Sequence, residues 1–176
     1  MAISKILCIK QSGKYQPARH LKAAIEYISA PEKTGGGKYV AGHNCIGEYA
    51  YNQMMATKKH FDKRDMRQGY HIILSFVENE VTPDTAFEIV GKFVGRYLGN
   101  KYEAIYSVHD NTDHVHGHII FNSVSCLNGL KFRYEKGDWE KYIQPIVNDL
   151  CTEYGLSTIA VEQAEDKVWY SYKDGR

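Results

Sequence analysis

Hydrophobic residues recur along the chain with two periods, one typical of helices and one typical of strands. In residues 17–30 the apolar side chains stand three or four positions apart, which predicts a helix with one buried face. They are Leu21, Ala24, Ile25 and Ile28. Pro17 suits the first turn of this helix, and Pro31 ends it.

A second helix is marked at both of its ends. Thr82 is a favoured N-cap, Pro83 suits the first helical position, and Asp84 places a negative charge in the first turn. The helical periodicity stops just before Gly99, which is a common residue after a helix end. Similar spacing predicts two further helices, over residues 47–62 and 138–154.

Short runs rich in isoleucine, valine and tyrosine predict strands. The most apolar of them is YHIILSFV, residues 70–77. Two more strands, residues 102–108 and 115–124, are joined by a polar turn and therefore form a hairpin. Strands are also expected at residues 3–9 and 39–45. Helices alternate with these strands, so we expect an α+β domain in which helices flank a central antiparallel sheet.

Length and composition indicate one soluble domain. The chain has 176 residues, of which 43% are hydrophobic and 24% are charged. No run reaches the roughly 20 apolar residues of a membrane span, and the N-terminal run is too short for a signal peptide. We therefore expect a cytoplasmic protein without membrane insertion. The domain should cover residues 1–160, with the polar segment 161–176 leading into a longer chain.

Positive charge is concentrated in the first part of the sequence. Residues 1–76 hold 12 Lys and Arg against 5 Asp and Glu, whereas residues 77–176 hold 10 against 16. This split indicates a basic face, or else a mixture of both parts on the folded surface. The glycine-rich segment 34–38 is expected to be a mobile loop. The four cysteines contain no CxxC pair and are typical of reduced thiols.

Four of the eight histidines fall within ten residues, in the sequence HDNTDHVHGH. His116 and His118 are two positions apart in an expected strand, so their side chains share one face. The neighbouring strand end can supply His109 as a third ligand. Three neutral imidazoles leave open positions on a metal ion, as catalytic sites require. Asp110 and Asp113 are candidates for orienting the imidazole rings.

The same histidines allow two other interpretations. The run HVHGHII, residues 114–120, resembles the motif of the histidine-triad nucleotide hydrolases, in which the middle histidine is a nucleophile and no metal is needed. That interpretation leaves His109 unexplained and expects an apolar residue at Gly117. A non-catalytic DNA-binding module with a structural metal is the other alternative. A chelator distinguishes these classes, because only an enzyme that uses the metal in catalysis loses its activity on chelation while keeping its fold.

Three motifs follow one another along the chain: LKAAIEYISAPEKT at 21–34, HIILSFVENEVTP at 71–83 and HDNTDHVHGHIIFN at 109–122. In this order they resemble the motifs of the relaxases of the HUH endonuclease superfamily, in particular the MOB-P (VirD-like) mobilisation class of conjugative plasmids and integrative elements. The family implies an antiparallel sheet whose central strands carry the metal, with the tyrosine helix against it. The sequence departs from the usual pattern of the family in two places. It has Gly117 at a position where the family usually has an apolar residue, and Asn111 at a position where many members have Asp.

The resemblance assigns roles to individual residues. Tyr27 matches the nucleophile, with Ser29, Tyr15 and Tyr39 as nearby alternatives, and the metal ligands it implies are His109, His116 and His118. Residues expected around the metal or facing the substrate are His114, Asp110, Asp113, Asn122 and His71. Basic residues expected to contact DNA are Lys33, Lys58, Lys59, Lys63, Arg64 and Arg67.

The implied activity is nicking and rejoining of DNA at a transfer origin, through a 5′-phosphotyrosine. One divalent metal ion is expected, magnesium or manganese in function, with zinc, nickel or cobalt able to replace it in a crystal. The expected partners are single-stranded or hairpin DNA at the origin, together with accessory relaxosome and coupling proteins. Attack by tyrosine conserves the phosphodiester bond energy in a covalent link, so the strand can be rejoined.

Overall fold

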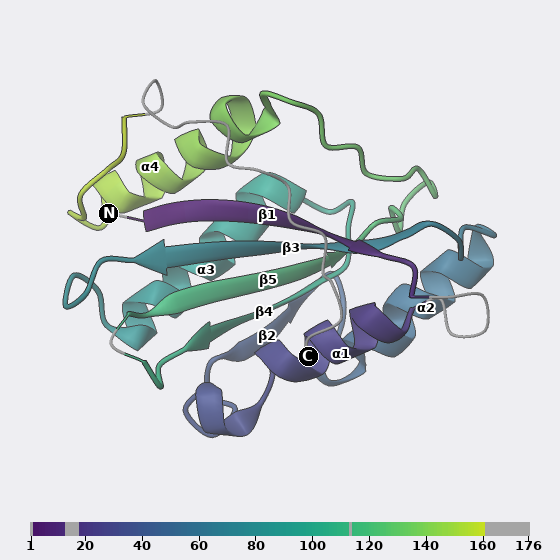
Figure 1. Cartoon of the computed structure of the whole chain (residues 1–176), viewed down its shortest axis with the longest axis horizontal. Helices are drawn as coiled ribbons and strands as arrows, with labels where there is room; N and C mark the ends of the chain where they lie inside the picture. Colours follow the sequence, from purple (N-terminus) through teal and green to yellow (C-terminus); the bar gives the residue numbers. More distant parts are fainter. Residues whose placement is uncertain (1, 13–17, 113, 161–176) are drawn as a thin grey trace.

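The computed structural model describes residues 2–12, 18–112 and 114–160. Its centre is a sheet of five strands in the order β1-β3-β5-β4-β2, in which all neighbours are antiparallel (Figure 1). The strands are β1 (Ala2–Lys10), β2 (Val40–His43), β3 (Arg67–Phe76), β4 (Ala104–His109) and β5 (His116–Asn122). The predicted α+β class, its antiparallel sheet and the central hairpin of β4 and β5 are confirmed.

Helices cover both faces of this sheet, and alternate strand residues contribute to two separate cores. On one face, Tyr70, Ile72 and Phe121 belong to the larger core, which α3 (Pro83–Leu98) and α4 (Gln144–Glu153) complete. On the other face, Ile120 joins a smaller core formed with α1 (Arg19–Ile28) and α2 (Ala50–His60). The period of two along each strand therefore decides which helices each side chain meets.

Residues that predicted a helix end or a buried helix face have that role in the structure. Thr82 caps α3 by accepting a hydrogen bond from the Thr85 backbone N–H at 3.2 Å, and Gly99 adopts a φ of 55° after the helix. The buried face of α1 consists of the predicted Leu21, Ala24, Ile25 and Ile28. Pro17 lies outside the described residues. No helix within the described ranges has the length and apolar character needed to span a membrane.

Three segments differ in detail from the sequence prediction. The helix predicted over residues 47–62 begins as a 3-10 turn, Gly47–Tyr49, before α2. The helix predicted over residues 138–154 begins as a π turn, Trp139–Ile143, before α4. The glycine-rich segment 34–38 forms consecutive hydrogen-bonded turns, in which Gly35, Gly36 and Gly37 have φ between 57° and 91°. Only glycine adopts this left-handed conformation without steric cost.

Gly117 lies between the two metal-ligand candidates of β5 but faces the opposite side of the sheet. A Cβ atom at this position would lie 2.3 Å from Cγ2 of Val90 on α3. The stiff valine side chain cannot turn away easily, because it is branched at Cβ. Close packing of α3 on the sheet therefore explains why this chain has glycine where the resembled motif usually has an apolar residue.

This contact leads to a stability prediction. Gly117→Ala should lower the free energy of unfolding by about 1–3 kcal/mol through overpacking, as measured by urea denaturation. The loss should be smaller when Val90 is also replaced by alanine. Gly95→Ala on α3 is the control, because its Cβ would meet no atom within 4 Å. An equal loss in the presence and absence of the Val90 side chain would contradict the steric explanation.

Candidate active site

The central hairpin brings the three predicted histidine ligands together. His109 and His116 are direct partners in the β4–β5 register, and His118 is opposite Ser107, two positions further along the same face. The ring centroids of His109 and His118 are 4.3 Å apart, and those of His116 and His118 are 6.0 Å apart. His109 and His118 are almost completely buried, whereas His116 is partly exposed.

Each of these rings has one nitrogen within hydrogen-bond distance of a neighbour. His118 Nδ1 lies 3.0 Å from His71 Nε2, and His109 Nε2 lies 3.2 Å from the carbonyl oxygen of Ile28. His116 Nδ1 lies 3.4 Å from Oγ1 of Thr112. The other nitrogen of each ring remains for a ligand. A histidine that holds a metal through one ring nitrogen typically makes a hydrogen bond through the other nitrogen, and this bond fixes the orientation of the ring.

Burial keeps this group of imidazoles uncharged. Desolvation lowers the pKa of His118 far below its ordinary value, and lowers the pKa of His71 to about 4. It also lowers the pKa of His109 and of His116. Neutral imidazole is the form that binds metal ions, so the donor set suits a divalent cation at neutral pH.

The free nitrogens of the three rings do not converge in this conformation. Among the described residues, no three His, Cys, Asp or Glu side chains are gathered closely enough to hold a metal ion. The rings are adjacent, but those of His109 and His118 are tilted by 52° to each other. The residues therefore fit a metal by the chemistry of their donor atoms and by their proximity.

Tyr27 lies beside these histidines. It stands next to the buried face of α1 and is 47% exposed, with its ring steeply inclined to those of His109 and His118 at centroid distances of 5.6 and 6.2 Å. The end of α1 contacts β4 directly, because Ile28 lies against His109 and the Lys33 carbonyl accepts a 3.0 Å hydrogen bond from the Asp110 backbone N–H. The tyrosine of the first motif and the histidines of the third thus occupy one site.

The alternatives to Tyr27 are differently placed. Tyr39 is only 7% exposed, and its hydroxyl donates to Asp84 at 3.3 Å. The hydroxyl of Ser29 donates to the Ile25 carbonyl of its own helix at 2.8 Å. Tyr15 lies outside the described residues. Of the alternatives that the structure describes, neither has the exposed position of Tyr27 beside the histidines.

The residues predicted to surround the metal are divided among different environments. His71 contacts His118 directly. His114 is exposed, and Asp110 is exposed with its carboxylate near Gly35. Asp113 lies outside the described residues. His71 is therefore the predicted neighbour that the structure places against a metal-ligand candidate.

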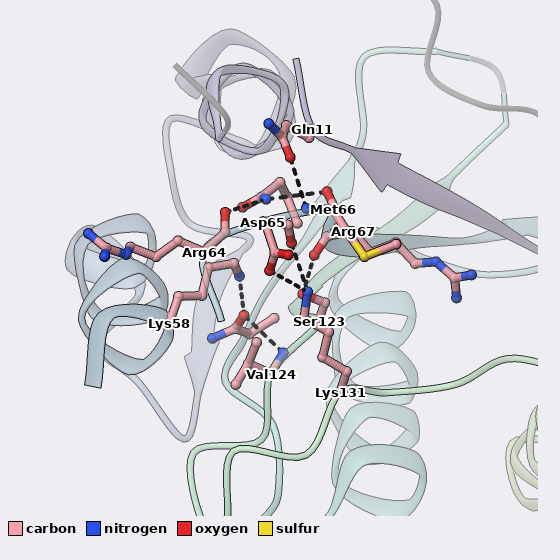
Figure 2. A network of polar contacts seen from close by, with 11 residues as sticks. Gln11, Lys58, Arg64, Asp65, Met66, Arg67, Ser123, Val124 and Lys131 are labelled. Atoms are coloured by element: carbon pink, nitrogen blue, oxygen red, sulfur yellow. Dashed lines mark hydrogen bonds and ion pairs between the residues drawn. The ribbon is translucent and has the colours of Figure 1, made fainter. Parts of the chain in front are cut away.

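Asn122 and Lys58 form a separate buried network, so two predicted roles are wrong. The Lys58 ammonium donates to Oδ1 of Asn122, whose Nδ2 donates to Glu103 at 2.7 Å. Lys58 has no exposed surface with which to contact DNA, and Asn122 follows His118 by four residues, or about 13 Å of strand. Figure 2 shows the Lys58 side chain extending to this network beside Val124.

Lys58 gives the unfolding free energy a specific pH dependence. Burial lowers its pKa from about 10.5 to about 7, although Glu103 opposes the shift. Between these values the unfolded chain binds a proton that the folded protein has released. The stability contributed by this site therefore rises with pH across that window, by up to about 1.4 kcal/mol per unit.

The comparison that tests this pH dependence uses Lys58→Met. The difference in unfolding free energy between the parent and Lys58→Met should shift in favour of the parent as the pH increases from 7 to 10 in urea titrations. Lys59→Met, which removes an exposed neighbour, should show no such trend. Parallel curves for the parent and Lys58→Met would contradict the lowered pKa of Lys58.

The remaining basic candidates are accessible. Lys59, Lys63, Arg64 and Arg67 are exposed at the connection between α2 and β3. In Figure 2, Arg64 and Arg67 lie on either side of Met66 in this connection. Lys33 is partly exposed and lies next to Tyr27 itself. These positions allow contacts with an anionic strand, unlike that of Lys58.

Known proteins are similar to this chain in sequence and in fold. A family model described as "Relaxase: MobA/VirD2-like, nuclease domain" matches residues 27–156. Protein rlx of Staphylococcus aureus is 33% identical over 136 residues, covering 77% of this chain and 40% of that protein. The group II intron-interrupted relaxase LtrB of Lactococcus lactis subsp. cremoris (strain MG1363) is 30% identical over 179 residues, covering 87% of this chain and 31% of LtrB. The chain thus spans less than half of the length of these two relatives.

The fold is also similar to a solved structure reported as "Molecular Basis of Vancomycin Resistance Transfer in Staphylococcus aureus". The TM-score is 0.58 at 15% identity, and the alignment covers 90% of this chain and 96% of that chain. At this identity the likeness concerns the fold alone. Because the family model matches most of the sequence, including Tyr27 and the histidine hairpin, the chain belongs to the MobA/VirD2-like relaxase family and carries its nuclease domain.

Proposed function

We propose that this domain nicks and rejoins one DNA strand at the transfer origin of a mobile element, as a relaxase of the MOB-P class. The supporting observation is the position of Tyr27, whose ring lies 5.6 Å from that of His109 and 6.2 Å from that of His118. This position supports a role for Tyr27 as the nucleophile beside the proposed metal ligands, whose imidazoles are neutral. We propose a cytoplasmic location and an association with relaxosome and coupling proteins.

In the proposed reaction the hydroxyl oxygen of Tyr27 attacks a backbone phosphorus atom. A bond forms between the tyrosine oxygen and phosphorus, and the bond between phosphorus and the 3′ oxygen breaks. The tyrosine proton passes to a base, and the departing oxygen takes up a proton to become a 3′-hydroxyl. The 5′ end stays on Tyr27 as a phosphodiester, so the reverse reaction restores the strand without an external energy source.

Three histidines are the proposed ligands of a divalent metal ion. A divalent ion held by His109, His116 and His118 would neutralise negative charge on the non-bridging phosphate oxygens. Imidazole ligands favour manganese over magnesium, which prefers oxygen donors. His71 orients His118, and His114 and Asp110 face the substrate. Contacts with the DNA backbone are assigned to Lys33, Lys59, Lys63, Arg64 and Arg67.

The test is a search for the covalent intermediate. The protein is incubated with manganese and labelled single-stranded oligonucleotides that tile the DNA flanking its gene, and the products are separated on a denaturing gel. We expect one oligonucleotide to yield a protein-linked fragment and a free 3′-hydroxyl fragment, and a chelator to prevent both. Cleavage without a linked fragment would instead indicate hydrolysis by water, and chelator-resistant nucleotide hydrolysis would indicate a histidine-triad enzyme.

A further inference from the structure

The ammonium of Lys33 lies over the face of the Tyr27 ring. Its Nζ is 3.6 Å from the ring centroid, inside the roughly 6 Å within which a cation is attracted to the negative face of an aromatic ring. No carboxylate of the described residues forms a salt bridge with Lys33. The aromatic ring is thus the principal partner of this charge in the described structure.

The backbone of Lys33 is fixed to the same elements that carry the active site. Lys33 ends the 3-10 turn Pro31–Lys33, in which its N–H donates to the Ala30 carbonyl at 3.0 Å. Its own carbonyl accepts from the Asp110 N–H, immediately after His109. A side chain that starts from this anchored position can hold a group on α1 in register with the histidines of the sheet.

The Tyr27 ring has few other restraints. It is 47% exposed, and its ring plane is inclined by 64° to that of His109 and by 83° to that of His118, so neither imidazole is stacked flat on it. An exposed ring changes torsion readily, whereas attack on phosphorus requires the hydroxyl in one orientation. A misplacement of about 1 Å can reduce a reaction rate by about 100-fold.

We propose that Lys33 is a positioning residue for Tyr27, because its ammonium holds the ring face while the rings of His109 and His118 lie beside it. The inference rests on the proposed role of Tyr27 as the nucleophile. It goes further in assigning to Lys33 the orientation of the nucleophile, in addition to the general attraction of a basic residue for DNA. The charge is the essential property, so arginine should replace lysine and a neutral side chain should not.

The first test separates orientation from DNA affinity. With the oligonucleotide that forms the adduct, Lys33→Met should slow single-turnover adduct formation at saturating DNA by about 10- to 100-fold, with an affinity loss of less than about threefold. Lys33→Arg should restore most of the rate. Lys22→Met is the control, since Lys22 is an exposed lysine of α1 paired with Glu26 at 3.8 Å, and it should react like the parent. Weaker binding with an unchanged rate at saturation would overturn the proposal.

The second test needs neither DNA nor metal. Lys33→Met should lower the melting temperature by about 2 °C in the parent, as expected for an exposed cation–π contact, and should have no effect once Tyr27 is leucine. Equal shifts in both backgrounds would overturn the proposal. If the parent formed no adduct with any oligonucleotide, the proposed function would fail, while the thermal comparison would still decide whether Lys33 restrains Tyr27.

Discussion

Tyr27→Phe should abolish the covalent adduct and leave binding of origin DNA unchanged. The substitution removes only the oxygen that we propose attacks phosphorus, so the ring keeps its neighbours His109, His118 and Lys33. Loss of a nucleophile typically lowers the rate by at least about 1000-fold. Adduct formation is measured on denaturing gels and affinity by fluorescence anisotropy with the same oligonucleotide.

Tyr39→Phe is the matched control for this experiment. It also removes one tyrosine hydroxyl, but from a buried ring that packs against Phe87 and bonds Asp84. The adduct should persist in this variant, with at most a small loss of stability. An adduct formed by Tyr27→Phe would show that another residue carries out the attack, and the proposed mechanism would be wrong.

Replacing His116 or His118 with alanine should remove manganese binding and, with it, DNA cleavage. Each substitution removes one of the three proposed imidazole ligands, and loss of comparable electrostatic stabilisation lowers catalytic rates by about 100- to 1000-fold. His116 is partly exposed and lies near Thr112, so its removal should leave the core intact. Binding is measured by calorimetry with manganese, and folding by circular dichroism.

His60→Ala is the control for this second prediction. His60 is an exposed histidine at the end of α2 whose ring contacts Phe61, and it should be replaceable without effect on metal binding or cleavage. If His116→Ala and His118→Ala bound manganese as tightly as the parent, the metal site would have to lie elsewhere in the protein.

The sequence predicted the sheet and the grouping of the histidines because both depend on local periodicity. His116 and His118 share a face by the period of two, and the short turn after His109 forces β4 and β5 to be neighbours. The order of the outer strands was not predicted, because it depends on which strands pair across long separations. The contact of Tyr27 with the histidines was inferred through the family resemblance, since spacing alone relates residues of one element only.

The wrong assignment of Lys58 has an identifiable cause. A run of charges near the end of α2 suggested an exposed helix face, yet Lys58 continues the buried row of Ala50 and Met54 at intervals of four residues. The periodicity was therefore present in the sequence. What the sequence did not contain was the partner, because Asn122 comes from a strand 64 positions later. A buried ammonium is stable only where such a partner exists.

The strand order has a consequence for the synthesis of this protein on the ribosome. β1 and β2, the first two strands to be made, lie at opposite edges of the sheet, and only β4 and β5 are neighbours both in sequence and in space. The nascent chain therefore cannot extend the sheet strand by strand. β1 can pair with β3, but β2 has no neighbouring strand until β4 is made, and β5 is needed to join β3 to β4. Such non-local pairing slows folding. It also means that the proposed nucleophile Tyr27 meets His109 and His118, which follow it by 82 and 91 positions, only after both of these proposed metal ligands have been translated.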